Sequence, residues 1–125
     1  MVEAMSNYDE DAKNERKKEV TIQDFLRIHL RVGKVTKAES ISGMKKIIRV
    51  NVDIGTEERE IAVGGAPYYK PEELIGKIVV VCTNLQPRKI GNINSNGMLL
   101  AANGYKGKPI FLTINEEAPV GANIH

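Results

Sequence analysis

The histidines, the cysteine and the paired carboxylates are the residues that could perform catalysis, and their positions do not favour it. His29 and His125 are the only histidines, and neither is spaced with the single cysteine as metal ligands are. Cys82 stands among valines, as a buried and unreactive thiol would. The acidic pairs at 57–58, 72–73 and 116–117 stand at turns or helix starts, without a neighbouring base. The sequence therefore predicts a protein that is not an enzyme and that uses no metal or cofactor.

Basic residues form a more informative pattern. Lys45, Lys46 and Arg49 stand at the start of an expected strand, and Arg88 and Lys89 stand in a later loop. If the fold brings these segments together, their charges form a strip that can follow the phosphates of a nucleic acid. Solvated side chains on an ordinary surface are the alternative, and the spacing alone leaves both open.

Polar side chains crowd the same later loop, which is expected over residues 85–96. They are Asn84, Asn92, Asn94, Ser95 and Asn96. Such groups can contact phosphate, sugar or base edges, or they can satisfy the backbone of the loop itself. Met98, just beyond, fits either a core position or an exposed one.

Composition and length indicate one ordinary globular domain. The chain has 125 residues, of which 42% are hydrophobic and 27% charged. The net charge of +2 divides into −2 over residues 1–20 and +4 over the rest, which suits a polyanionic partner. Residues 1–20 lack apolar periodicity and are expected to form a charged, flexible tail before a domain at 21–125.

The compartment is indicated by what the sequence contains. A single cysteine excludes an internal disulfide framework and fits a reducing environment. No apolar run is long enough to cross a bilayer, and the first residues lack the apolar core of a signal peptide. We therefore expect a cytoplasmic protein with no membrane partner.

Short alternating apolar runs predict a mainly β fold. The predicted strands span 30–39, 46–54, 58–63, 77–84, 97–102 and 109–114. Gly33 is expected to mark a bulge or bend in the first of them. A short N-terminal helix should begin after Thr21, and a one-turn helix should begin at Pro71, between strands three and four. This order predicts a five-stranded OB-fold barrel with a short C-terminal strand extension.

Several separate blocks resemble the tRNA-binding domain family. They are Asp24-Phe25-Leu26, Leu30-Arg31-Val32-Gly33-Lys34-Val35, Lys46-Ile47-Ile48-Arg49-Val50, Tyr69-Lys70-Pro71-Glu72-Glu73-Leu74, Asn84-Leu85-Gln86-Pro87-Arg88-Lys89 and Ser95-Asn96-Gly97-Met98. The chain is most similar to the domain appended at the C-terminus of methionyl-tRNA synthetases, in a free-standing form such as a separate β subunit.

The resemblance implies an OB barrel, a homodimer and recognition of tRNA by its folded shape. It also implies methionyl-tRNA synthetase as a partner. The family's binding face falls on six residues of this chain, and Arg49 is added to them as a seventh. They are Lys46, Arg49, Asn84, Arg88, Lys89, Ser95 and Met98.

Two other binding functions stay open. Some relatives bind polypeptides as chaperones or in secretion, and exposed apolar residues near Met98 would favour that function. Other OB barrels bind single strands by stacking bases on aromatic rings. Phe25 and Phe111 are both expected to be buried, which argues against single-strand binding.

Overall fold

The computed structural model describes residues 18–125, so the flexible tail expected over residues 1–20 lies, up to residue 17, outside them. The described elements are, in chain order, α2 (Ile22–Phe25), β1 (Leu30–Ile41), β2 (Met44–Asp53), β3 (Glu58–Val63), α3 (Pro71–Leu74), β4 (Ile78–Cys82), β5 (Arg88–Ile90), β6 (Ile93–Ser95), β7 (Met98–Leu99), β8 (Ala101–Asn103), the 3₁₀ turn η1 (Tyr105–Gly107), β9 (Pro109–Phe111) and β10 (Asn123–Ile124). None of the described helices is long and apolar enough to cross a membrane.

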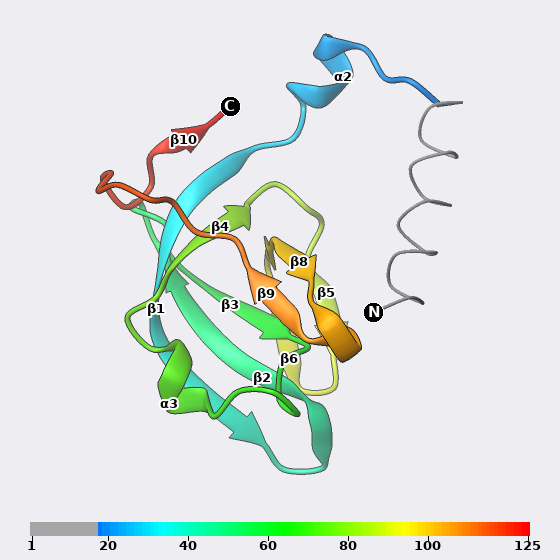
Figure 1. Cartoon of the computed structure of the whole chain (residues 1–125), viewed down its shortest axis with the longest axis vertical. Coiled ribbons are helices and arrows are strands. Elements are labelled where there is room, and N and C mark those ends of the chain that lie inside the picture. Colours follow the sequence, from blue (N-terminus) through cyan, green and yellow to red (C-terminus); the bar gives the residue numbers. More distant parts are fainter. Residues whose placement is uncertain (1–17) are drawn as a thin grey trace.

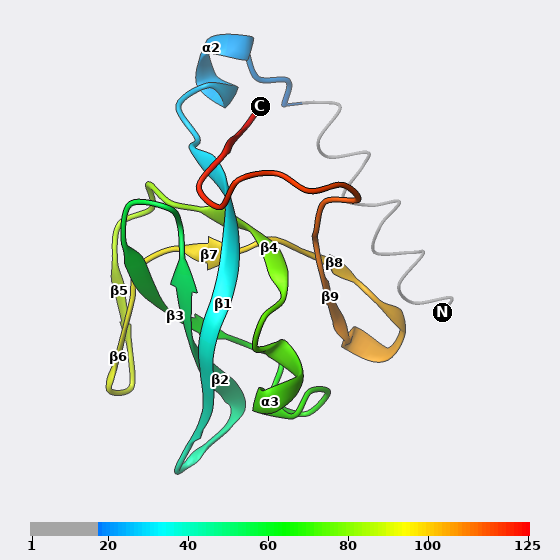
Figure 2. The same ribbon diagram turned by 90° about the vertical axis from the view of Figure 1, so that its left-hand side faces the viewer.

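One curved antiparallel sheet forms the body of the molecule (Figure 1). Its strand order is β3-β2-β1-β4-β7, and β10 pairs with the start of β1. β5–β6 and β8–β9 are separate two-stranded hairpins on its flanks (Figure 2). The mainly β prediction is therefore confirmed. Among the described strands, however, no ladder joins β3 to β7, so the sheet is open and the predicted closed five-stranded barrel is not confirmed.

The core lies on the inner face of this sheet. Ile48, Val50 and Val52 alternate along β2 and are fully buried, as the period of a half-buried strand requires. Gly33 lies where β1 crosses them: a Cβ there would lie 2.6 Å from Val52 Cγ1 and 2.8 Å from Val81 Cγ2. Gly33 thus permits close packing. The bulge predicted at Gly33 lies instead between Val35 and Lys37.

Both predicted helices form, and each begins as its sequence indicates. The Thr21 hydroxyl accepts a hydrogen bond from the Asp24 amide (3.1 Å), which caps α2. α3 begins at Pro71, and Glu73 accepts from the backbone amide of Lys70 at 2.7 Å. α2 lies well apart from α3, beyond the far end of β1 (Figure 1).

Three predictions, two on segments of the second half of the chain and one on Phe25, are wrong. The expected loop 85–96 contains the hairpin β5–β6, because Ile93 is fully buried and anchors it. The expected strand 97–102 is divided into β7 and β8 at Leu100, because the chain changes partner there: the Leu100 amide still donates to Val80, whereas its carbonyl accepts from Leu112 and β8 pairs with β9. Phe25 was expected inside but is 43% exposed.

Candidate nucleic-acid interface

The basic hairpin, defined as residues 88–95, presents the two cations of the later loop. Arg88 pairs with Ser95 and Lys89 with Asn94 across β5–β6, and both cationic residues are exposed. Gly91 makes the turn with a φ of 60°. The buried Ile93 anchors this short hairpin to the core, so the two cations are held at the surface and stay exposed to solvent.

The tip of the basic hairpin lies against the start of β2. A Cβ at Gly91 would lie 2.9 Å from Met44 Sδ, so the side chain of Met44 packs against the turn of the hairpin. Lys45 and Lys46 follow Met44 directly and are exposed. The fold thus brings together the two basic segments that are more than forty residues apart in the sequence. The resulting set, which we call the cationic strip, consists of Lys45, Lys46, Arg88 and Lys89.

Arg49 is on the same strand as Lys45 and Lys46, but unlike them it is paired with carboxylates. Its guanidinium forms an ion pair with Glu39 and lies 3.9 Å from a carboxylate oxygen of Glu60. Two carboxylates therefore offset its charge. The members of the cationic strip differ, because the ion pairs in the described part of the chain all involve Arg49 or Arg59.

Asn84 and Ser95 hold the chain at the base of the basic hairpin. The Asn84 amide group donates to the Arg27 carbonyl (2.6 Å), and its oxygen accepts from the His29 amide (2.9 Å). Ser95 is only 6% exposed, and its hydroxyl oxygen accepts from the Ala62 amide at 3.0 Å. Both side chains are thus engaged within the fold, and Asn84 ties the segment after α2 to the end of β4.

Met98 lies in a hollow that is lined mainly by apolar side chains. We define the apolar groove by its main apolar lining, which is Phe25, Leu26, Ile28, Leu30, Leu85, Met98 and Leu100. The groove has a volume of about 970 Å³, and Met98 is 46% exposed within it. It runs between α2 and the strands β4 and β7, beyond the base of the basic hairpin.

Arg59 is a functional candidate that the sequence reasoning missed. Its guanidinium donates to the Thr83 carbonyl (2.9 Å) and to the carbonyl and side chain of Asn96 (3.3 and 3.2 Å). One side chain therefore holds both the segment that precedes the basic hairpin and the segment that follows it. A signal was present: Arg59 has the strand parity of the buried Ile61, an unusual position for an arginine.

We expect Arg59→Met to loosen the basic hairpin. The methionine keeps the apolar stem but removes three hydrogen bonds to the two segments, each of them worth about 1–3 kcal/mol to a charged donor. Amide hydrogen exchange of residues 88–96 should accelerate at least about tenfold relative to β1 and β2. Arg31→Met, which removes an arginine that donates to the Gly121 carbonyl at the other end of the domain, is the control. Equal exchange in both variants would contradict a positioning role for Arg59.

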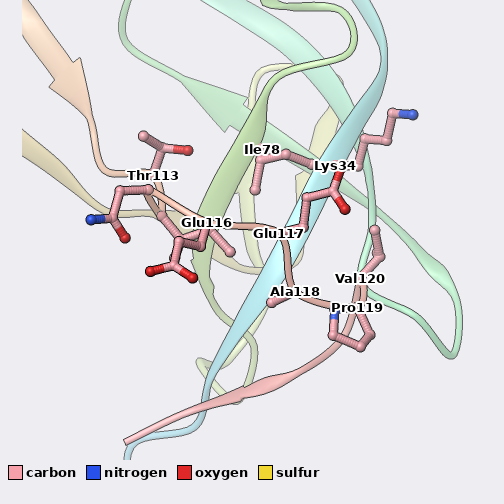
Figure 3. A pocket seen from close by; sticks show the side chains of 10 residues that line it. Lys34, Ile78, Thr113, Glu116, Glu117, Ala118, Pro119 and Val120 are labelled. Carbon is pink, nitrogen blue, oxygen red and sulfur yellow. The ribbon is translucent and has the colours of Figure 1, made fainter.

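A second large hollow lies under the C-terminal segment (Figure 3). It also measures about 970 Å³, and its lining includes Glu116, Glu117 and a single lysine, Lys34. Two carboxylates against one cation do not suit a polyanion. Nor do the described residues bring together three histidine, cysteine or carboxylate groups that could hold a metal.

The architecture and its surface define a mainly β binding domain with cations on an ordered hairpin. A family of this class matches residues 30–123 and is described as "Putative tRNA binding domain"; the chain belongs to this family. The domain it names is a binding domain and not a catalytic one, although homologues carry it as part of an enzyme.

Relatives of known sequence include the methionine–tRNA ligase of Archaeoglobus fulgidus. It is 44% identical over 115 residues, which are 92% of this chain but 17% of the ligase. The chain thus spans about a sixth of the length of that relative.

Similar solved structures include a MetRS-related protein and a chaperone. A MetRS-related protein from Pyrococcus horikoshii has a TM-score of 0.80 and 40% identity, over 86% of this chain and 99% of that one. The chaperone CsaA from Bacillus anthracis has a TM-score of 0.78 and 30% identity over the same shares.

Proposed function

We propose that this chain binds tRNA without catalysis and recognises its folded shape. The observation that carries the proposal is the contact of the basic hairpin tip with the start of β2, which assembles the cationic strip in a chain of the tRNA-binding family. Lys46, Arg88 and Lys89 pair with phosphates, each by a charge-assisted hydrogen bond. Four cations at fixed positions match phosphates in a fixed geometry, which a folded RNA offers and a flexible one does not.

The remaining residues of the predicted face act around these cations. Asn84 and Ser95 order the base of the basic hairpin through the hydrogen bonds they already make. Met98 contacts an unstacked base or sugar from the edge of the apolar groove. Arg49 remains a predicted tRNA contact. To bind a phosphate, its guanidinium would have to give up its ion pair with the carboxylate of Glu39.

The domain is inferred to be an OB-type barrel over residues 21–125 whose gap is bridged by single hydrogen bonds. α3 stands between β3 and β4, as the OB order of elements requires. Across the gap, the Asn96 amide donates to the Glu60 carbonyl (2.8 Å), next to the bond between Ala62 and Ser95. These contacts support closure of the barrel without a continuous ladder.

A homodimer is proposed through the exposed apolar residues of α2 and of the segment that follows it. Ile22, Leu26 and Ile28 are all at least half exposed, which is a large apolar surface for a small domain. A second copy of the same surface would cover these residues symmetrically and would place two cationic strips on one assembly. Sedimentation should then give twice the monomer mass, and Leu26→Glu should give the monomer.

Methionyl-tRNA synthetase is the proposed enzyme partner, and the cytoplasm is the proposed location. The support is the similarity to part of methionine–tRNA ligases. A binding domain held near the enzyme raises the local tRNA concentration without adding catalytic contacts.

The second candidate function is the binding of an extended polypeptide. The similarity to the chaperone CsaA and the apolar groove favour it. A peptide would use apolar contacts in the groove, so its binding would depend little on salt, whereas binding to phosphates weakens steeply as salt rises.

A titration separates these functions. Folded bulk tRNA, an unstructured RNA of matched length and an unfolded polypeptide are each titrated at two salt concentrations. We expect salt-sensitive preference for folded tRNA. Equal binding of both RNAs would contradict shape recognition, and polypeptide binding alone would replace the tRNA proposal with the chaperone-like one.

A further inference from the structure

A second basic surface lies on the turn between β8 and β9. We call it the tyrosine–lysine patch and define it as Tyr68, Lys70, Lys77, Tyr105, Lys106 and Lys108. The Tyr68 hydroxyl donates to the Lys106 carbonyl at 2.7 Å, which ties the turn η1 to the segment after β3. The neighbouring Tyr69 hydroxyl donates to the Pro109 carbonyl, also at 2.7 Å. Two hydroxyl bonds thus fix the patch to the body of the fold.

Two lysines of the patch lie at one aromatic ring. Lys108 Nζ lies 5.0 Å and Lys77 Nζ 5.9 Å from the centre of the Tyr69 ring. Lys70 is the next residue after Tyr69 in the chain, and Lys106 lies in the turn η1. In residues 18–125 the only ion pairs are those of Arg49 and Arg59, so no described carboxylate pairs with these lysines. Two unpaired cations at one ring, with a third in the turn that Tyr68 holds, favour an anionic partner.

The backbone of the turn is strained at its lysine. Lys106 has a φ of 62° and a ψ of 24°, which is the left-handed region that costs a non-glycine residue about 1 kcal/mol. The other residues of the described chain in that region are glycines. Lys106 and Gly107 are the two central residues of the β8–β9 hairpin turn, both have positive φ, and the Lys108 amide donates to the Tyr105 carbonyl at 3.4 Å. The turn therefore presents the Lys106 side chain where asparagine, aspartate or glycine is usual.

Exposed aromatic rings accompany these cations. Tyr105 is 68% and Tyr68 40% exposed, although the sequence suggested that few rings were left for stacking. Every nucleobase has a face that can stack on such a ring, and adjacent lysines can hold the flanking phosphates. This combination of rings and cations differs from the cationic strip, which contains no aromatic residue.

We propose that the tyrosine–lysine patch binds an unpaired stretch of RNA. A base stacks on Tyr105, and Lys106 and Lys108 bind the adjacent phosphates. The inference rests on the proposed function, since it assigns a second contact to the same RNA. The patch is separate from the basic hairpin: Figure 2 shows β5–β6 and the turn after β8 on opposite sides of β1. An RNA that binds both surfaces uses two different parts of its structure. Its folded body binds the cationic strip, and an unpaired segment binds the tyrosine–lysine patch.

The test uses the full chain, a folded tRNA and a short single-stranded oligoribonucleotide. Tyr105→Ala should weaken binding of the oligonucleotide about tenfold, and Tyr105→Phe should keep it. Lys106→Gly should lower the slope of log affinity against log salt by about 0.7. Because glycine suits this backbone, Lys106→Gly should leave the melting temperature unchanged or raise it, so a binding loss cannot come from unfolding.

The outcomes separate this inference from the proposed function. If tRNA binds but Tyr105→Ala and Lys106→Gly bind the oligonucleotide as the unchanged chain does, the patch is overturned and the proposed function stands. If the oligonucleotide binds through Tyr105 but tRNA does not bind, the proposed function is overturned and the patch stands. If polyglutamate binds as well as the oligonucleotide and Tyr105→Ala weakens neither, the patch is a general anion surface and the inference is overturned.

Discussion

Replacing Lys46, Arg88 and Lys89 together with alanine is expected to weaken tRNA binding by about 100-fold. Each side chain loses a charge-assisted contact with a phosphate, and at an exposed site such a loss is about 1 kcal/mol, so the three losses sum to about 3 kcal/mol. The slope of log affinity against log salt should fall by about 2–3, because three fewer counterions are released. A binding titration of the triple variant over a range of salt measures both quantities.

Controls for this prediction come from lysines elsewhere on the surface. Lys37→Ala removes one exposed lysine on β1, at a position that pairs with Asn51 of β2 and not with the basic hairpin. It should weaken binding less than any single change in the cationic strip. If Lys37→Ala and Arg88→Ala weaken binding equally, the whole surface charge attracts the RNA and the strip has no special part.

A large effect on stability is expected from Gly33→Ala. The new Cβ would lie 2.6 Å from Val52 Cγ1 and 2.8 Å from Val81 Cγ2, where real contacts do not occur. Both valines are buried and their side chains are too short to move aside, so β1 must shift. Overpacking of this kind costs about 1–3 kcal/mol, which lowers the melting temperature by about 4–15 °C. Thermal unfolding followed by circular dichroism measures it.

Gly64→Ala is the matched control for this substitution. A Cβ at Gly64 meets nothing within 4 Å, and its φ is not in the left-handed region. The same chemical change should therefore leave the melting temperature nearly unchanged, or raise it slightly by restricting the unfolded chain. A loss at Gly64 as large as the loss at Gly33 would contradict the packing explanation.

The strands of the sheet were predictable because alternation records burial. Ile48, Val50 and Val52 show their shared face in the sequence itself, and the cap at Thr21 and the proline at position 71 mark both helices. The basic residues could also be identified in the sequence, but the sequence did not predict that their two segments meet. That meeting depends on Gly91 approaching Met44, a long-range contact without a local signal.

Other features were hidden because the sequence does not show partners. Ser95 reads as a polar loop residue, yet it is buried because its hydroxyl accepts from Ala62. Arg49 reads as a free cation, yet Glu39 pairs with it across β1 and β2. The left-handed conformation of Lys106 had no signal in the sequence, since a turn of this kind usually has asparagine, aspartate or glycine at that position.

The central claim is that folded tRNA binds at the basic hairpin and the start of β2. An NMR titration of the isotope-labelled chain with folded tRNA tests it most directly. The account predicts that amide signals of residues 88–95 and of Lys45 and Lys46 shift or broaden first, before those of α2 and the apolar groove. Changes confined to Phe25, Leu26 and Met98 would contradict the account and favour a polypeptide-type groove, and no change at saturating tRNA would refute tRNA binding.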